Sequence, residues 1–78
     1  MNTPKYSQIT VDLSDITGNV FDIMGRVTNQ FRQQAKNLNI SEELILEDLR
    51  EYHKAAMHAI THNDAYLIAN KYASLLVS

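Results

Sequence analysis

Apolar residues between positions 20 and 38 repeat with the spacing of one face of an α-helix. They are Val20, Ile23, Met24, Val27, Phe31, Ala35 and Leu38. This spacing aligns the apolar side chains along one side of a helix, so the pattern predicts a helix from Val20 to about Asn37 that packs on a core. Gly18 permits a turn before this helix, and Asn19 stands where a capping side chain is favoured.

The segment before this helix has a different period. Ile9, Val11 and Leu13 are separated by polar residues, which is the two-residue alternation of a half-buried strand. The pattern predicts a strand over Ser7–Leu13, and we expect residues 1–6 to form a flexible tail.

Two further amphipathic segments follow the first helix. Ser41 is a favourable N-cap and is followed by acidic residues, so we predict a second helix from Glu42 to about Ile60. Asn63 can cap a third helix, predicted from Asp64 to Leu76. A short strand over Leu75–Ser78 is the alternative for the last residues.

One strand and three helices make a mainly α, small α+β fold, in a single domain covering residues 1–78. A lone strand leaves backbone donors and acceptors unpaired at its edges. Since no second strand is convincing, we expect the strand to pair antiparallel with the same strand of another subunit across a two-fold axis. The sequence therefore predicts a homo-oligomer, either a dimer or a larger assembly.

Composition narrows the classes of function. A chain of 78 residues buries a small core, and the lack of cysteine excludes disulfides and thiolate metal sites. The formal net charge of −2 argues against a nucleic-acid partner held by charge. No apolar run approaches the roughly 18–20 residues of a membrane span, so we expect no membrane partner and a cytoplasmic location.

The histidines are the first candidates for chemistry. His58 and His62 are four residues apart, the spacing of two metal ligands when both lie on one helix, and Asp64 is near. Two histidines alone are a weak metal signature, so the favoured interpretation places His62 at a helix C-terminus, where a partial positive charge is stabilised. His53 has no paired nucleophile and is expected to be satisfied locally or to face solvent. The sequence thus predicts no enzyme activity, no metal and no cofactor.

Other residues allow both a structural and a ligand-binding interpretation. Gly25 inside the first helix costs about 1 kcal/mol relative to Ala, which indicates either close approach of another helix or backbone access for a ligand. Arg26 suits either a phosphate group or a solvated surface. The acidic residues Glu47, Asp48 and Glu51 are interpreted as a solvated helix face.

A longer motif supports a resemblance. Val11-Asp-Leu followed by Gly18-Asn-Val-Phe-Asp-Ile-Met-Gly-Arg-Val27 resembles small phage and prophage proteins in which a strand precedes Gly-Asn-Ala-Phe-x-Ile-Met/Leu-Gly-x-Val. Ser41-Glu-Glu and Asn63-Asp-Ala-Tyr66 fit the same outline. The chain departs from this pattern at Val20 and in its longer second helix. The resemblance implies a phage-like accessory protein.

The expected function is therefore non-enzymatic binding that inhibits or sequesters a host component, as in counter-defence within the host cytoplasm. The target is either a host protein surface or a small signalling nucleotide held at subunit interfaces. For a nucleotide, the expected ligand-binding residues are Gly18, Asn19, Arg26 and Tyr66. The alternative is a structural or scaffolding module for protein–protein interaction.

Overall fold

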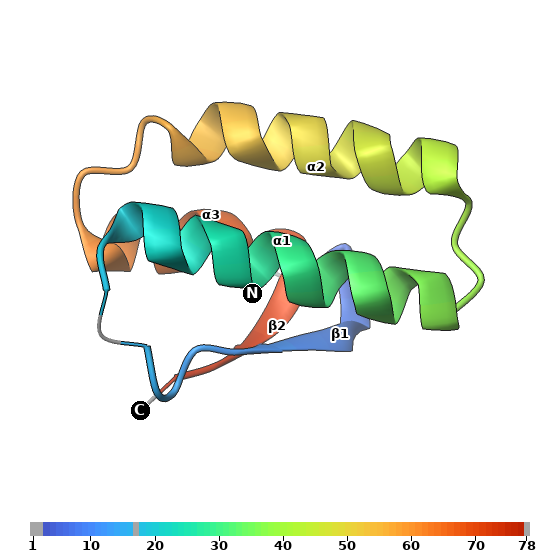
Figure 1. The fold of residues 1–78 in the computed structure, drawn as a ribbon, viewed down its shortest axis with the longest axis horizontal. Coiled ribbons are helices and arrows are strands. Elements are labelled where there is room, and N and C mark those ends of the chain that lie inside the picture. The colour runs from blue at the N-terminus through green and yellow to red at the C-terminus, as the bar shows by residue number, and fades with distance from the viewer. Residues whose placement is uncertain (1–2, 17, 78) are drawn as a thin grey trace.

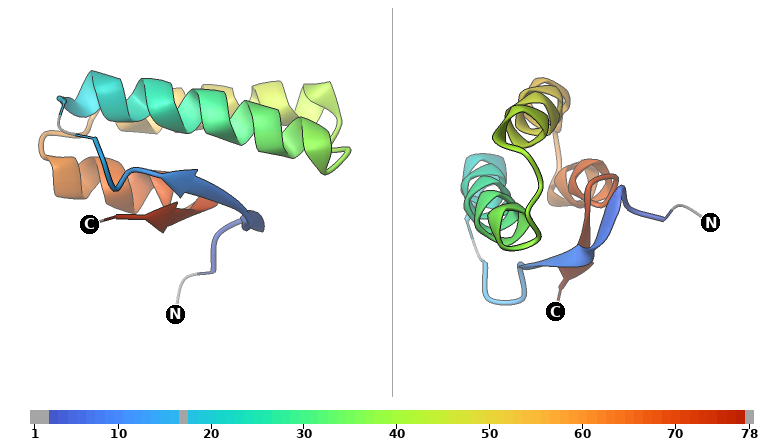
Figure 2. Two further views of the ribbon diagram at one scale, coloured as in Figure 1. Left: turned by 60° about the horizontal axis from the view of Figure 1, so that its bottom comes forward. Right: turned by 90° about the vertical axis from the view of Figure 1, so that its right-hand side faces the viewer.

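The computed structural model describes residues 3–16 and 18–77 and places three helices on one side of a two-stranded parallel sheet (Figure 1). The elements are β1 (Tyr6–Asp12), α1 (Val20–Asn37), α2 (Glu42–Ala56), α3 (His62–Ala69) and β2 (Ala73–Leu76). Helices α1 and α3 contact the sheet, and α2 packs across both of them (Figure 2). Within the described ranges, no helix combines the length and apolar character required to span a membrane.

The core follows the predicted periodicities. Ile9, Val11 and Leu13 all point toward the helices and are almost completely buried, as the alternation predicts. The apolar side of α1 meets them through Ile23, Val27, Phe31 and Ala35. The bounds of α1 agree with the prediction, and β1 is displaced by one residue from the predicted strand.

The second and third helices are shorter than predicted. Helix α2 ends at Ala56 instead of Ile60, because the chain turns there to bring α3 back against the other helices. Thr61, and not Asn63, is the N-cap of α3. Thr61 Oγ1 accepts a hydrogen bond from Asp64 N at 3.1 Å, and Asp64 Oδ2 accepts one from Thr61 N at 3.2 Å. This reciprocal capping box fixes where α3 begins.

The end of the chain corrects the predicted continuation of the third helix to Leu76. Helix α3 stops at Ala69, and β2 then runs parallel to β1, with Val11 beside Leu75 and Asp12 beside Leu76. Leu13 N donates to Leu76 O at 2.7 Å. The premise that the N-terminal strand lacks a partner in its own chain is therefore wrong. The alternative prediction of a short strand over Leu75–Ser78 is confirmed in that a strand is present, but the strand spans Ala73–Leu76. Ser78 lies outside the described residues.

The opposite edge of β1 is closed by side chains of α1. Thr10 N donates to Gln34 Oε1 at 2.9 Å, and Gln34 Nε2 donates back to Thr10 O at 2.7 Å. Asp12 N donates to Gln30 Oε1 at 2.8 Å, while Arg26 Nη1 donates to Asp12 O at 3.0 Å. These side chains occupy backbone positions that a neighbouring strand would use. Pairing of β1 with another subunit would have to displace them.

A buried carboxylate holds the start of β1. Asp48 of α2 has a side chain only 2% exposed, and it accepts hydrogen bonds from Lys5 Nζ at 2.7 Å and Tyr6 OH at 2.6 Å. The Tyr6 ring also packs edge-on against Phe31. Interpreting Asp48 as part of a solvated face was therefore wrong. The predicted flexible tail of residues 1–6 is wrong for Lys5 and Tyr6, and its first two residues lie outside the described part of the chain.

Removing the hydroxyl of Tyr6 tests this contact. We expect Tyr6→Phe to lower the free energy of unfolding by about 1.5–3 kcal/mol, the range for a hydrogen bond to a charged group, because the buried Asp48 loses one donor. Urea denaturation measures the change. Tyr66→Phe is the matched control, since the described contacts include no hydrogen bond from the Tyr66 hydroxyl. Equal effects of the two variants would contradict the assignment.

Alkaline pH should weaken the fold. The hydrogen bond to Asp48 raises the pKa of Lys5, burial followed by the same acceptor raises the pKa of Tyr6, and burial raises the pKa of Tyr52 to about 12. Since unfolding returns these groups to ordinary pKa values near 10, the unfolded state loses protons first. The stability contributed by these three groups should be constant below pH ~9 and be lost between pH ~10 and ~12.

Urea denaturation across this pH range measures the slope. The Lys5→Met/Tyr6→Phe double variant should show a shallower decline, and the remaining slope should come mainly from the other buried tyrosines. A slope identical to that of the unaltered chain would show that Lys5 and Tyr6 do not contribute to it.

Candidate binding surface

The start of α1 is closed by its own side chains. Asn19 Oδ1 accepts from Asp22 N at 3.1 Å, and Asp22 Oδ2 accepts from Asn19 N at 3.0 Å, which confirms Asn19 as the N-cap. Gly18 lies so close to Asp22 that an added Cβ would overlap the carboxylate. The positive end of the helix thus already has a negative group beside it. This arrangement gives no direct support to a phosphate at Gly18 and Asn19.

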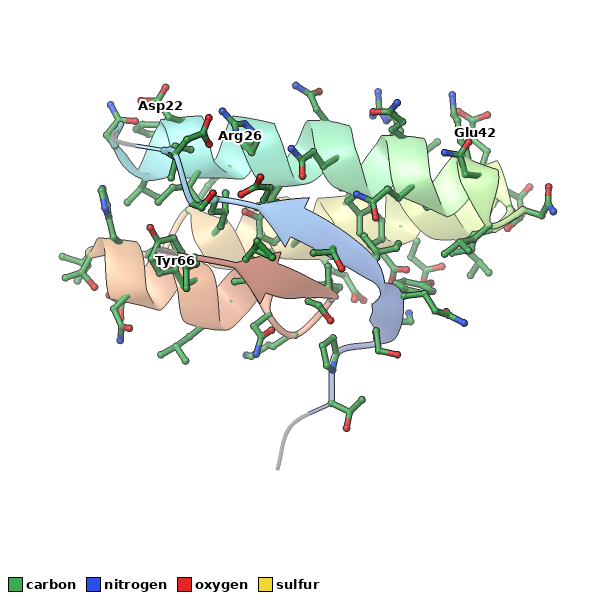
Figure 3. All side chains as sticks on the ribbon, turned by 90° about the horizontal axis from the view of Figure 1, so that it is seen from below. Asp22, Arg26, Glu42 and Tyr66 are labelled. Carbon is green, nitrogen blue, oxygen red and sulfur yellow. The ribbon has the colours of Figure 1, made fainter. Side chains whose placement is uncertain are left out.

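An open groove of about 510 Å³ runs along the first three turns of α1. Figure 3 shows two of its residues, Asp22 and Arg26, one turn apart on this helix. The full lining is Asp15, Ile16, Gly18, Phe21, Asp22, Gly25, Arg26 and Asn29. The groove therefore combines an exposed aromatic ring with polar side chains of both charges.

Gly25 has no packing partner where its side chain would be. A Cβ built at this position meets no atom within 4 Å. The interpretation of Gly25 as a site of close helix approach is therefore wrong for this chain. Phe21 and Asn29 stand four residues to either side on the same helical row, so Gly25 forms a notch between them. The backbone at this notch is accessible from solvent.

Arg26 is engaged within the chain. Its Nη1 donates to Asp15 Oδ1 at 3.0 Å and to Asp12 O at 3.0 Å, so it ties the loop after β1 to α1. The Asp15 side chain is 72% exposed, and an ion pair this exposed contributes at most about 1 kcal/mol. Arg26 is thus partly neutralised as a receptor for phosphate.

The apolar part of the site continues on the other side of Phe21. A smaller groove of about 100 Å³ is lined by Val20, Phe21, Ala56, Met57 and Ala59. Phe21 is 73% exposed and Met57 is 76% exposed, although both are large apolar side chains. We call Phe21, Gly25, Asn29 and Met57 the Phe21 surface. It joins the first turns of α1 to the end of α2.

The structure brings together three of the four predicted ligand residues. Gly18 and Arg26 line the larger groove. Asn19 lies next to Gly18 and is the N-cap of α1, the helix that carries Arg26. Tyr66 lies on α3 and lines a different groove. Sequence reasoning missed Phe21, yet a signal was present, because this aromatic residue lies outside the apolar stripe of its helix.

The histidines have structural surroundings. Thr28 Oγ1 donates to Met24 O at 2.8 Å, so His53 Nε2, 2.7 Å from the same hydroxyl oxygen, must act as the donor. His53 therefore links α2 to α1. His58 follows the end of α2 and His62 begins α3, so they do not share one helix face. Among the described residues, no group of three or more acidic or histidine side chains is arranged to hold a metal.

Comparison of the chain with protein-family models, with curated proteins and with solved structures found no significant match.

The two glycines of this site should respond oppositely to alanine. Gly25→Ala should raise the free energy of unfolding by about 0.5–1 kcal/mol, because alanine has the higher helix propensity and its methyl group meets open space. Gly18→Ala should lower it by about 0.5–2 kcal/mol, because the methyl group displaces Asp22 from the capping box. Thermal and urea denaturation measure both variants. Loss of stability in Gly25→Ala would reveal packing that the structure does not contain.

Proposed function

We propose that this chain is a non-enzymatic binding protein that covers a site on a partner protein with the Phe21 surface. The observation that carries the proposal is the notch at Gly25 beside the exposed ring of Phe21. A helix-weakening glycine with no role in the chain's own packing is explained when an external group approaches the helix backbone there. Exposed aromatic rings beside such a notch are typical anchors of protein interfaces.

The polar groups of the groove favour a protein partner over a nucleotide. The lining of the groove contains two carboxylates, Asp15 and Asp22, and one cation, Arg26. Arg26 already donates a hydrogen bond to Asp15. At the start of α1, the N–H of the N-cap Asn19 already donates to the Asp22 carboxylate, and Asp22 N donates to Asn19 Oδ1. A phosphate group would have to displace both arrangements. An apolar side chain of a protein would instead gain contact with Phe21 and Met57 without displacing an ion pair.

The biological setting of the proposal comes from the phage-like motif. A protein of this kind would act inside the host cell, and covering a host protein surface would inhibit that protein without catalysis. This is a counter-defence function of the binding type. Sequestration of a small signalling nucleotide by Gly18, Asn19 and Arg26 remains the competing version, and the experiment below distinguishes the two.

Binding is tested with the full chain as bait in a lysate of the host. Proteins retained by the unaltered chain should be lost with Phe21→Ala, with at least a tenfold rise in Kd, as expected for an aromatic anchor. Gly25→Ala should also weaken binding, even though it makes the isolated chain more stable. Leu44→Ala is the matched control, because Leu44 is an exposed leucine near the start of α2, away from the Phe21 surface.

Two results would contradict the proposal. Retention that is equal for the unaltered chain, Phe21→Ala and Gly25→Ala would show that the Phe21 surface is not used. A thermal shift with cyclic nucleotides or ADP-ribose derivatives that disappears in Asn19→Ala or Arg26→Ala would favour nucleotide sequestration.

A further inference from the structure

The outer edge of β2 leaves backbone groups without partners. Leu76 O accepts from Leu13 N at 2.7 Å, so the backbone of Leu76 faces β1. Because successive residues of a strand direct their N–H and C=O groups to opposite edges, Ala73, Leu75 and Val77 direct theirs away from β1. In the two-stranded sheet of the described residues, β2 has a strand neighbour on its β1 side alone, and no turn, loop or side-chain hydrogen bond there uses the N–H of Leu75 or Val77. This edge is free to pair with another strand.

The two edges of the sheet differ in protection. Gln30 and Gln34 cover the edge of β1, as described above. Along Ala73–Val77 there is no proline and no charged residue, and no side chain of residues 3–16 or 18–77 bonds to the backbone of this segment. Natural sheets usually block an exposed edge with one of these devices. The chain thus closes one edge and leaves the other open.

A groove beside the open edge could receive side chains from an added strand. It measures about 310 Å³, and its lining is Asn63, Tyr66, Leu67, Asn70, Leu75 and Val77. Leu67 is 61% exposed and Val77 is 51% exposed, so much of this apolar area faces solvent. Figure 2 shows β2 running alongside α3, which forms the other wall. A strand paired with β2 would direct alternate side chains toward this wall.

We infer that the open edge binds β2 of a second copy of this chain, antiparallel across a two-fold axis. With the two Leu75 residues opposite each other, Ala73 of each copy faces Val77 of its partner. The outward backbone groups then bond to one another, and the side chains on the helix-covered face are all apolar. The paired segments carry no charge, so no like charges meet.

The resulting dimer has a continuous four-stranded sheet with β2 of each copy at its centre. Leu75 and Val77 of both copies extend the apolar layer beside Leu67 and Tyr66. This contact replaces the predicted pairing through β1, and it gives Tyr66 a place at the subunit interface. The inference goes beyond the proposed function, because it does not involve the Phe21 surface.

Backbone hydrogen exchange and sedimentation test the pairing. Raising the protein concentration should slow exchange at the N–H groups of Leu75 and Val77 while Leu76, already paired with β1, changes little. Val77→Pro removes an outward N–H and should raise the dimer dissociation constant at least tenfold above that of Val77→Ala. Both variants lose the valine side chain, but the alanine variant keeps the backbone N–H that the proline variant lacks.

A covalent trap gives an independent readout. The chain has no cysteine, so Leu75→Cys introduces its only thiol. Mild oxidation should join two copies across the axis faster than it joins copies of the Leu44→Cys control. Equal rates of cross-linking, exchange that is independent of concentration, or a monomer at every concentration would each overturn the inference. Tighter association of Gln34→Ala, with no effect of Val77→Pro, would instead place the interface at β1, because Gln34 covers that edge.

Discussion

The parallel pairing of the two ends of the chain is the constraint on which the fold depends. Parallel neighbours cannot be joined by a tight turn, so a long connection must cross over the sheet. Here α1, α2 and α3 together form that connection, and they all lie on the face where Ile9, Val11 and Leu13 are buried. The four-residue segment Ala73–Leu76 therefore determines which side of the sheet the three helices cover. If it were helical, β1 would have no strand partner among the described residues, and α3 would lose the strand that it packs against.

Asp48 couples the outermost helix to the strand beneath the other two. Helix α2 packs on α1 and α3 instead of on the sheet. Its carboxylate reaches the strand region at Tyr6, the first residue of β1, and at Lys5 just before it. The ladder between the strands is irregular between Tyr6 and Thr10, where β1 leaves its regular register. A buried carboxylate adds little net stability, but it accepts only well-placed donors. Its effect is to select one position for the start of β1.

The sequence pattern predicted the elements whose formation depends on residues close together in the chain. Helix α1 follows from its apolar period and the Asn19 cap, and β1 follows from alternation. Strand β2 was ambiguous because Leu75, Leu76 and Val77 form a continuous apolar run, which fits a helix or a buried strand equally, and its partner lies at the other end of the sequence. Asp48 was misjudged as one acid among several. Its spacing from Ile45 and Tyr52 nevertheless places it on the buried side of α2.

The two surfaces that the fold leaves unexplained lie on different elements, and this bears on how the protein would act. The Phe21 surface belongs to α1 and the end of α2, while the open edge belongs to β2 with α3 beside it. Pairing through β2 would leave the residues of the Phe21 surface outside the contact in both copies. A dimer would then carry this surface twice. For a partner that is itself oligomeric, the second contact would form at high effective concentration, so a small apolar surface could hold it firmly.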